Sequence, residues 1–142
     1  MSAMSDWLEG QIRAHMFRTA TYTKPTVSSV ALCTAATTDA TTGATITEVS
    51  NANAYARTGP APLDANWTAA SATDGLTDNA AAITFPTCTT ATWGTVSHMA
   101  ICDSATWGAG NVAVHGALTA SKVVGVGDVF QFAAGALDIT YA

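Results

Sequence analysis

The sequence is poor in charged residues. Only 11% of its 142 residues are Asp, Glu, Lys or Arg, against about 25% in a typical soluble domain. A monomer with so little surface charge is weakly protected against association. The composition therefore predicts a chain whose surface is covered by other protein. The alternative is a surface that stays soluble through its many threonine hydroxyls.

Basic residues are scarcer still, with five in the chain and a net charge of −5. Three of them, Arg13, Arg18 and Lys24, lie near the N-terminus, and the acidic remainder offers no basic stripe for a phosphate backbone. We therefore expect no nucleic-acid partner. The N-terminal segment is the part expected to meet an acidic protein surface.

Long apolar runs are also missing. None reaches the roughly 20 residues that a membrane-spanning helix needs. The first ten residues carry Asp6 and Glu9 and lack the basic and apolar regions of a signal peptide. No membrane partner and no signal peptide are expected.

Cysteine is rare and odd in number. Cys33, Cys88 and Cys102 match no zinc-binding spacing. One interpretation is three free thiols in a reducing cytosol, and the other is one disulfide formed later in an oxidising medium. Cys102 lies in an apolar strand pattern and is expected to be buried. Cys88 lies in a threonine-rich loop and is expected to be accessible, so it is the candidate for a disulfide, with Cys33 as the possible second member.

No cluster of reactive side chains can be recognised. His98 and His115 occupy neighbouring predicted strands with Asp103 nearby, but no ligand spacing supports a metal. No base-orienting third group supports a cysteine nucleophile, and paired carboxylates cannot be placed at the separation that glycoside hydrolases use. We therefore expect no enzyme activity, no cofactor and no metal.

One amphipathic helix is expected, over residues 6–17. Asp6 is the expected N-cap, and Glu9 three residues later completes the capping-box pattern. An apolar stripe at four-residue spacing runs along the helix, flanked by Trp7 and His15. A helix this short needs a surface to dock on, which is either its own sheet or a neighbouring subunit. The stripe consists of Leu8, Ile12 and Met16.

The rest of the chain has the pattern of an all-β domain. Short segments of alternating apolar residues are separated by glycine, proline and aspartate turns, as in antiparallel sandwiches and barrels. We predict an antiparallel β-sandwich or barrel, jelly-roll-like, over residues 25–142, preceded by an N-terminal helix and arm over 1–24. The clearest expected strands cover residues 27–34, 80–85, 96–103, 111–119, 129–132 and 137–141, and weaker ones lie at 48–49, 53–58 and 65–70.

An ordered series of short blocks carries a resemblance to a known family. The series begins with T-Y-T-x-P-T and V-A-L-x-T-A and ends with G-A-L-T-x-S-K and F-A-A-G-A-L-x-I-T. In this order the chain resembles small tailed-bacteriophage virion structural proteins, which include tail-fibre-like proteins and β-sandwich proteins that decorate capsids. The blocks cover residues 21–26, 30–35, 47–50, 54–57, 83–86, 92–98, 116–122 and 132–140.

The resemblance implies a non-enzymatic virion protein made in the bacterial host cytoplasm, and it does not assign a position in the particle. The capsid surface is the location that we expect. The first hypothesis is a capsid cement (decoration) protein, expected as a homotrimer that binds the major capsid protein or other virion proteins. The alternative is a tail, neck or fibre component that binds a partner protein or a host surface glycan. Either assembly would bury the surface that a low-charge monomer exposes. The interface candidates are Trp7, Leu8, Ile12, Arg13, Met16, Arg18, Lys24 and Trp107.

Overall fold

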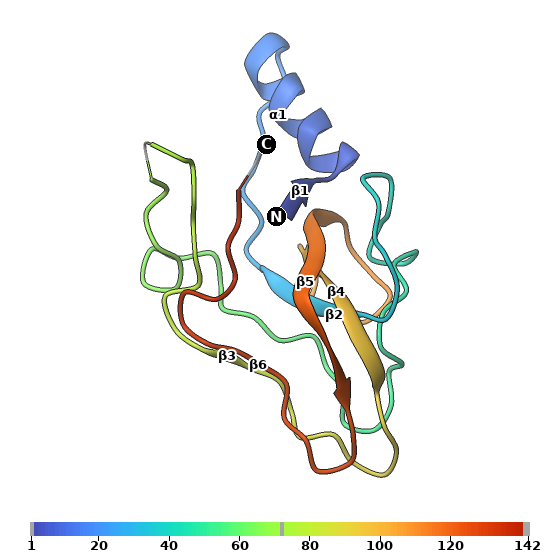
Figure 1. The fold of residues 1–142 in the computed structure, drawn as a ribbon. Coiled ribbons are helices and arrows are strands. Elements are labelled where there is room, and N and C mark those ends of the chain that lie inside the picture. Colours follow the sequence, from blue (N-terminus) through green and yellow to red (C-terminus); the bar gives the residue numbers. More distant parts are fainter. Residues whose placement is uncertain (1, 72, 141–142) are drawn as a thin grey trace.

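Four antiparallel strands form the main sheet of the computed structural model, which describes residues 2–71 and 73–140. β2, β4 and β5 confirm three of the predicted strands. Their alternating apolar and β-branched residues favour a pleated surface that is buried on at least one face. In order across the sheet the strands are β1 (Ser2–Met4), β5 (Val112–Val124), β4 (Gly94–Cys102) and β2 (Ser29–Cys33) (Figure 1).

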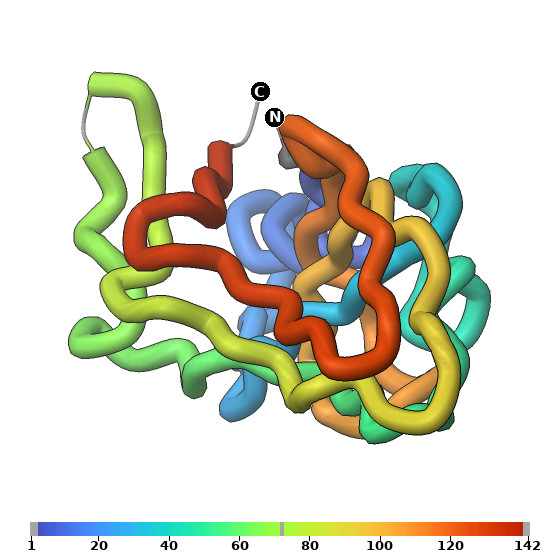
Figure 2. Tube along the Cα trace, turned by 60° about the horizontal axis from the view of Figure 1, so that its bottom comes forward, coloured from blue at the N-terminus to red at the C-terminus, as the bar shows by residue number. Residues whose placement is uncertain are grey.

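A second, smaller layer lies over this sheet. Its ladder consists of β3 (Ile83–Thr84) and β6 (Gln131–Phe132), which are antiparallel and shorter than the strands predicted for these residues. Figure 2 shows the two segments, yellow-green and red, running side by side. The fold is therefore all-β with one short N-terminal helix, as predicted. Closure into a sandwich or barrel stays a prediction.

The weaker predicted strands exist only as isolated bridges between single residue pairs. Near one of them, Asn53 and Ala54 have φ values of 55° and 65°. This left-handed backbone turns the chain where a strand would have to continue. The predicted C-terminal strand is likewise one bridge, between Thr77 and Ile139, and Tyr141 lies outside the described residues. The other bridges join Cys33 with Glu48, Val30 with Thr58, and Trp67 with Asn79.

The main hydrophobic core lies between the two layers. Its centre is Phe85, which is 2% exposed and stacks on Tyr55 with ring centroids 6.4 Å apart. Phe130 and Phe132 meet the Phe85 ring edge-on at 5.8 and 6.4 Å, which confirms the predicted inward face of their segment. Trp93 packs edge-on against Tyr55 from the other side. Each such aromatic pair contributes about 0.5–1.5 kcal/mol beyond the burial of its area.

β2 is buried on both faces. Val30 and Leu32, which were predicted to share one face, belong to the main core. Ala31 and Cys33 belong to a smaller cluster. Ile46, from the segment that follows β2, packs against them in this cluster. The loop that connects β2 to residue 48 is therefore packed against the sheet, although its sequence indicates only an irregular segment.

The N-terminus begins with a strand that the sequence did not predict. β1 pairs antiparallel with the first half of β5. Helix α1 (Asp6–Phe17) follows directly, and its N-cap is Ser5, so the predicted N-cap at Asp6 is wrong by one residue. The buried Ser5 hydroxyl accepts from the Leu8 N–H at 3.3 Å and donates to the Val112 carbonyl of β5. Because one hydroxyl serves both elements, the start of the helix is anchored in the sheet.

Candidate functional site

The apolar stripe of α1 is divided between the chain's own packing and solvent. Leu8 is 6% exposed, Ile12 is half-buried, and both line a groove of about 280 Å³ whose far wall includes Ile101 of β4. Trp7 is also half-buried, with its ring edge-on to Tyr22 at 6.4 Å. The first two turns of the helix therefore dock on the chain itself, which is one of the two outcomes expected for the stripe.

The end of α1 is exposed to solvent, and we call Met16, Phe17 and Arg18 the helix tip. Met16 is 66% exposed and Phe17 78%, although both are large apolar side chains. Arg18 caps the helix through its backbone N–H, which donates to the Ala14 carbonyl at 3.1 Å. Figure 1 shows the helix leaving the sheet at its first turn, so that the tip stands away from the β-rich body. An exposed apolar patch with a polar rim is typical of a protein contact site.

Two of the three predicted basic contacts are already engaged within the chain. Arg13 pairs with Glu9 at 2.8 Å on the exposed helix surface, and such pairs contribute only about 0.3–0.5 kcal/mol. Lys24 donates to the Pro62 carbonyl at 2.9 Å and so ties the arm after the helix to the body. Among the residues that the structure describes, Arg18 has no hydrogen bond or ion pair through its side chain. Arg18 is therefore the cation most available to a partner.

Trp107 lies on a loop between β4 and β5 and is fixed there. Its side chain is 43% exposed, and its indole N–H donates to the Val49 carbonyl at 2.8 Å. The loop closes on Asp103, whose carboxylate accepts from the backbone and side-chain amides of Asn111 at 2.7 and 2.8 Å. The exposed edge of the indole is thus presented on a preformed loop, as a contact candidate separate from the helix tip.

A buried ion pair between Arg57 and Glu48 was not predicted. Their side chains are 0% and 2% exposed, and Nη2 of Arg57 lies 2.7 Å from Oε2 of Glu48. The Arg57 guanidinium makes five hydrogen bonds, two to Glu48 and three to backbone carbonyls. Glu48 and Arg57 are the only charged residues between Asp39 and Asp64, and this isolated pair of opposite charges is the signal that could have found them. The three carbonyls belong to Gly43, Ser104 and Ala109.

Tyr55 completes this cluster. Its hydroxyl accepts from the Leu32 N–H at 2.9 Å and donates to Glu48 at 2.8 Å. Burial and the Glu48 carboxylate raise the pKa of Tyr55, so the hydroxyl stays protonated and keeps donating. Burial is the largest single influence on the pKa of Arg57 and lowers it. The hydrogen bonds to Glu48 and the nearby Cys102, Glu48 and Tyr55 together outweigh burial, so the pKa lies above its ordinary value. The cluster binds two loops to the sheet and has no exposed group for a ligand.

The histidines make local contacts as well. His115 is 6% exposed, with Nδ1 2.9 Å from the Thr37 hydroxyl and Nε2 3.0 Å from an Asp39 carboxylate oxygen. A hydroxyl, an imidazole and a carboxylate in this order resemble a nucleophilic triad, but the triad carboxylate is buried and Asp39 is 60% exposed. The Asp39 carbonyl also accepts a hydrogen bond from the first N–H of α1. The cluster therefore holds the loop that contains Thr37 and Asp39 against the sheet and the helix. His98 instead contacts the adjacent Ser97 hydroxyl at 2.9 Å.

All three cysteines are buried and free. The predicted burial of Cys102 is confirmed, but the expected accessibility of Cys88 is wrong, since Cys88 is 1% exposed. Its N–H donates to the Asp128 carbonyl and its carbonyl accepts from Gly127, so its segment is bound to the turn before β6. Burial raises the pKa of Cys33 to about 12 and that of Cys102 to about 11. A disulfide between subunits through Cys88 or Cys33 stays a prediction.

One comparison with known proteins gives a match, and it covers almost the whole chain. Residues 3–140 match the family described as podophage GP4 fiber I protein gp80. None of the curated proteins matches the chain. In the described part of the chain, no helix is long and apolar enough to cross a membrane. The family match confirms the resemblance to tailed-phage virion structural proteins. The chain belongs to the family of podophage GP4 fiber I protein gp80 and is a structural component of a bacteriophage virion.

Proposed function

We propose that this chain is a non-enzymatic structural subunit that joins other virion proteins through its helix tip. The observation that carries the proposal is the exposure of Met16 and Phe17, 66% and 78%, beside the Arg18 side chain, which has no partner among the described residues. Large apolar residues, aromatic residues and arginine are the types that dominate binding energy at protein interfaces. A partner with an apolar recess and an acidic rim would bury this tip and neutralise its charge.

A non-enzymatic role is supported by the way the reactive side chains are engaged. Burial raises the pKa of Cys33 and Cys102, which disfavours the thiolate that nucleophilic chemistry requires. His115 is held between a hydroxyl and a carboxylate of one loop. A role without nucleic acid is supported by Arg57, because this cation is enclosed in protein and contributes nothing to a basic surface.

A fibre is the placement in the virion that we favour. The matching family is described as a fiber protein, and the helix tip stands away from the body, where it suits attachment between successive subunits (Figure 1). Capsid decoration is the second candidate. It is favoured by the charge content of 11%, because a subunit spread over the shell buries much of its surface in protein contacts. A homotrimer is the oligomer expected for decoration.

Copy number and position distinguish these two placements. Quantitative mass spectrometry of purified virions, with the major capsid protein as internal standard, should give about six to a few dozen copies for a fibre. Electron microscopy of virions that carry a tagged chain should place the tag on an appendage. Copies on the order of hundreds, distributed over the shell, would instead establish decoration.

Variants of the helix tip test the attachment itself. The double change Phe17→Ser and Arg18→Glu should lower incorporation into virions at least about tenfold, because it removes an aromatic anchor and reverses a charge. The matched control is Val126→Ser, which removes a 61% exposed apolar side chain from the turn between β5 and β6. Circular dichroism checks that all variants are folded. Normal incorporation of the tip variant would contradict the proposal.

A further inference from the structure

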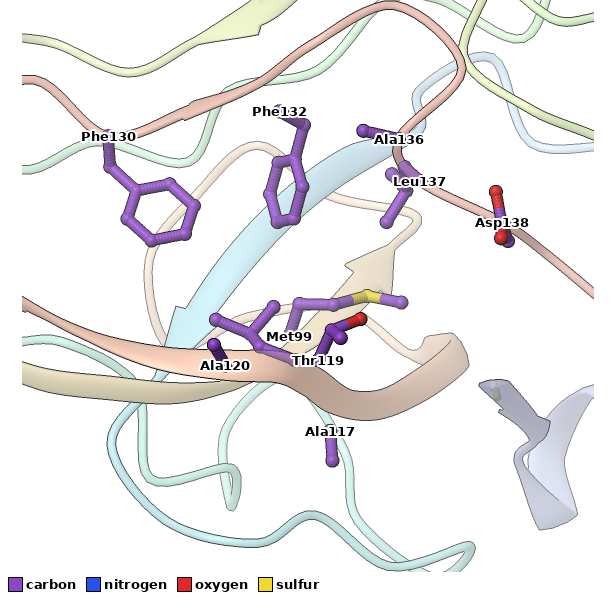
Figure 3. Close-up of a pocket in the computed structure, with 10 residues that line it drawn as sticks. Met99, Ala117, Thr119, Ala120, Phe130, Phe132, Ala136, Leu137 and Asp138 are labelled. Carbon is purple, nitrogen blue, oxygen red and sulfur yellow. The ribbon is translucent and has the colours of Figure 1, made fainter.

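A groove of about 250 Å³ opens along one side of the molecule, and we call it the β5–β6 groove. Figure 3 shows the rings of Phe130 and Phe132 directed from the upper segment toward Met99 and Thr119 on the main sheet. Asp138 stands at one end of the groove. The groove is therefore lined by aromatic and aliphatic side chains together with Thr119, and it has an acidic end.

The groove stays open because the middle of β5 is bulged. On either side of Ser97, Val96 pairs with Lys122 and His98 pairs with Ala117. The β5 residues 118–121 therefore lie opposite the single β4 residue Ser97. On its other edge β5 is covered by β1 only before the bulge begins. Among the described residues, the middle of β5 consequently has no partner in the register of the sheet on either edge. A bulge of this kind is a common device for ending strand pairing and redirecting side chains.

A second carboxyl group lies next to the acidic end of the groove. Asp78 lies beside Asp138, and Oδ1 of Asp78 is buried with no hydrogen-bond partner among the described residues. Burial, and then the neighbouring Asp138, raise the pKa of Asp78, as expected when two carboxyl groups lie so close that ionisation of one disfavours ionisation of the other. Asp138 is the exposed member of the pair, so a cation that reaches it from outside would stabilise this end of the groove.

The chain itself contains a free cation that fits this position. Five of its residues are basic, and four of them already bond to other residues of the same chain. The fifth, Arg18, has no side-chain partner in the described part of the chain. It follows Phe17, which at 78% has the largest exposure among the large apolar residues. The four engaged cations are Arg13, Lys24, Arg57 and Lys122.

We propose that the helix tip of one copy of this chain docks in the β5–β6 groove of a second copy. Phe17 packs on the ring of Phe132, and aromatic contact at the groove floor fixes its orientation. The Arg18 guanidinium donates to the exposed Asp138 carboxylate, and the neighbouring Asp78 adds to the negative charge at this end. Because tip and groove are different surfaces, the contact is heterologous and closes into a ring or repeats along a row. The inference rests on the proposed function and deepens it, since it identifies a sister subunit as the partner of the tip.

Cross-linking between copies tests the contact directly, and the buried native thiols leave the background low. Two single variants are mixed and oxidised: Met16→Cys at the tip and Thr119→Cys in the groove. We expect at least about ten times more mixed disulfide dimer than in the control mixture of Met16→Cys with Val126→Cys, because docking raises the effective concentration of one thiol near the other. Equal yields from the two mixtures would overturn the proposal.

Charge reversal with rescue tests the recognition. Arg18→Asp and Asp138→Arg, each measured alone by analytical ultracentrifugation, should weaken self-association at least about tenfold, since each opposes like charges across the contact. An equimolar mixture of the two variants should restore association, because the reversed tip of one fits the reversed groove of the other. A mixture that remains as weak as the single variants, or a wild-type chain that stays monomeric throughout, would refute self-docking.

Virion incorporation separates failure of this inference from failure of the proposed function. If tip variants lose incorporation while Asp138→Arg leaves both incorporation and self-association unchanged, the tip binds a different virion protein, and only self-docking is overturned. If tip variants lose self-association but incorporate normally, the attachment role of the tip is wrong while the contact between copies stands.

Discussion

Two arginines of this chain carry the same guanidinium in opposite surroundings. Arg57 is buried, and its five hydrogen bonds bind Glu48 and the carbonyls of two loops. Arg18 caps α1, lies in solvent and has no side-chain partner among the described residues. The same residue type therefore holds the body together in one place and remains available to a partner in the other.

The contrast extends to the regions around the two arginines. In the body, Phe85 and its aromatic neighbours fill the space between two layers. At the helix tip, Phe17 is 78% exposed and contributes little to the fold. Substitutions in the body should therefore cost free energy of unfolding, and substitutions at the tip should cost association alone.

Removal of Arg57 should have the largest effect. Arg57→Ala leaves the Glu48 carboxylate buried without its counter-ion and removes the donor from three backbone carbonyls. Breaking a buried pair in this way costs about 3–5 kcal/mol, which urea denaturation followed by circular dichroism measures. Arg18→Ala is the matched control and should change the free energy of unfolding by less than about 0.5 kcal/mol. Similar losses for the two variants would break the comparison.

Truncation of an aromatic ring compares the same two regions through apolar burial. Phe132→Ala should destabilise the fold by about 3 kcal/mol, the lower end of the range for such changes, because its ring is 8% exposed and lines the groove. Phe17→Ala removes the same ring from the tip and should lie within about 0.5 kcal/mol of wild type. Equilibrium denaturation gives both values. A destabilising Phe17→Ala would mean that the tip packs on the body.

The sequence predicts the long strands well because their side chains alternate. In β4 and β5 the period of two indicates a strand, although both faces of these strands are buried over residues 99–102 and 114–116. At Phe130 and Phe132 the same period gives the buried face. β1 has only three residues, which is too short for any period to be recognised. The helix stripe was predicted as one surface, yet Leu8 docks and Met16 does not. Where docking ends depends on where the sheet ends, and the helix sequence does not contain that information.

The partners of isolated polar residues were not predictable in the same way. Arg57 and Glu48 stand out as a pair, but three of the five Arg57 hydrogen bonds go to carbonyls of loops that only the tertiary fold brings together. Cys88 was expected to be accessible because threonines surround it in sequence. Its burial follows from backbone hydrogen bonds to the turn before β6, about 40 residues away along the chain.

The effect of Asp78 on the stability of the body should depend on pH, and this dependence gives a further test. The pKa of Asp78 is raised above its ordinary value of 3.8, first by burial and then by Asp138. The folded chain therefore holds this proton more tightly than the unfolded chain, and the resulting stabilisation is full below pH 3.8 and lost as the pH rises through the raised pKa. Asp78→Asn should be more stable than wild type at pH 7, and the difference should shrink as the pH falls toward 4.

Thermal unfolding across this pH range, on protein dilute enough to be monomeric, checks the sign. Asp64→Asn is the matched control, since it removes one exposed aspartate from a neighbouring loop. If the difference in unfolding temperature between Asp78→Asn and wild type stays constant with pH, Asp78 is solvated in the same way in the folded and unfolded chains. In that case an arginine that docks at the acidic end of the groove would gain no stabilisation from Asp78.

The smallest effect is expected for chemical labelling of the three thiols. Labelling tests whether the buried cysteines stay inaccessible to a reagent in the folded chain. Cys33 and Cys102 have pKa values raised to about 12 and about 11, chiefly by burial, so little reactive thiolate exists at pH 8. Cys88 is 1% exposed, and its Sγ lies 3.1 Å from the Ala91 carbonyl oxygen. An alkylating reagent should therefore label none of the three in the native chain and all of them in denaturant, with mass spectrometry as the readout. Val126→Cys should label at once and serves as the exposed control. Labelling of Cys88 alone would show that its segment opens from the turn before β6, and that opening would make it competent for a bond between subunits.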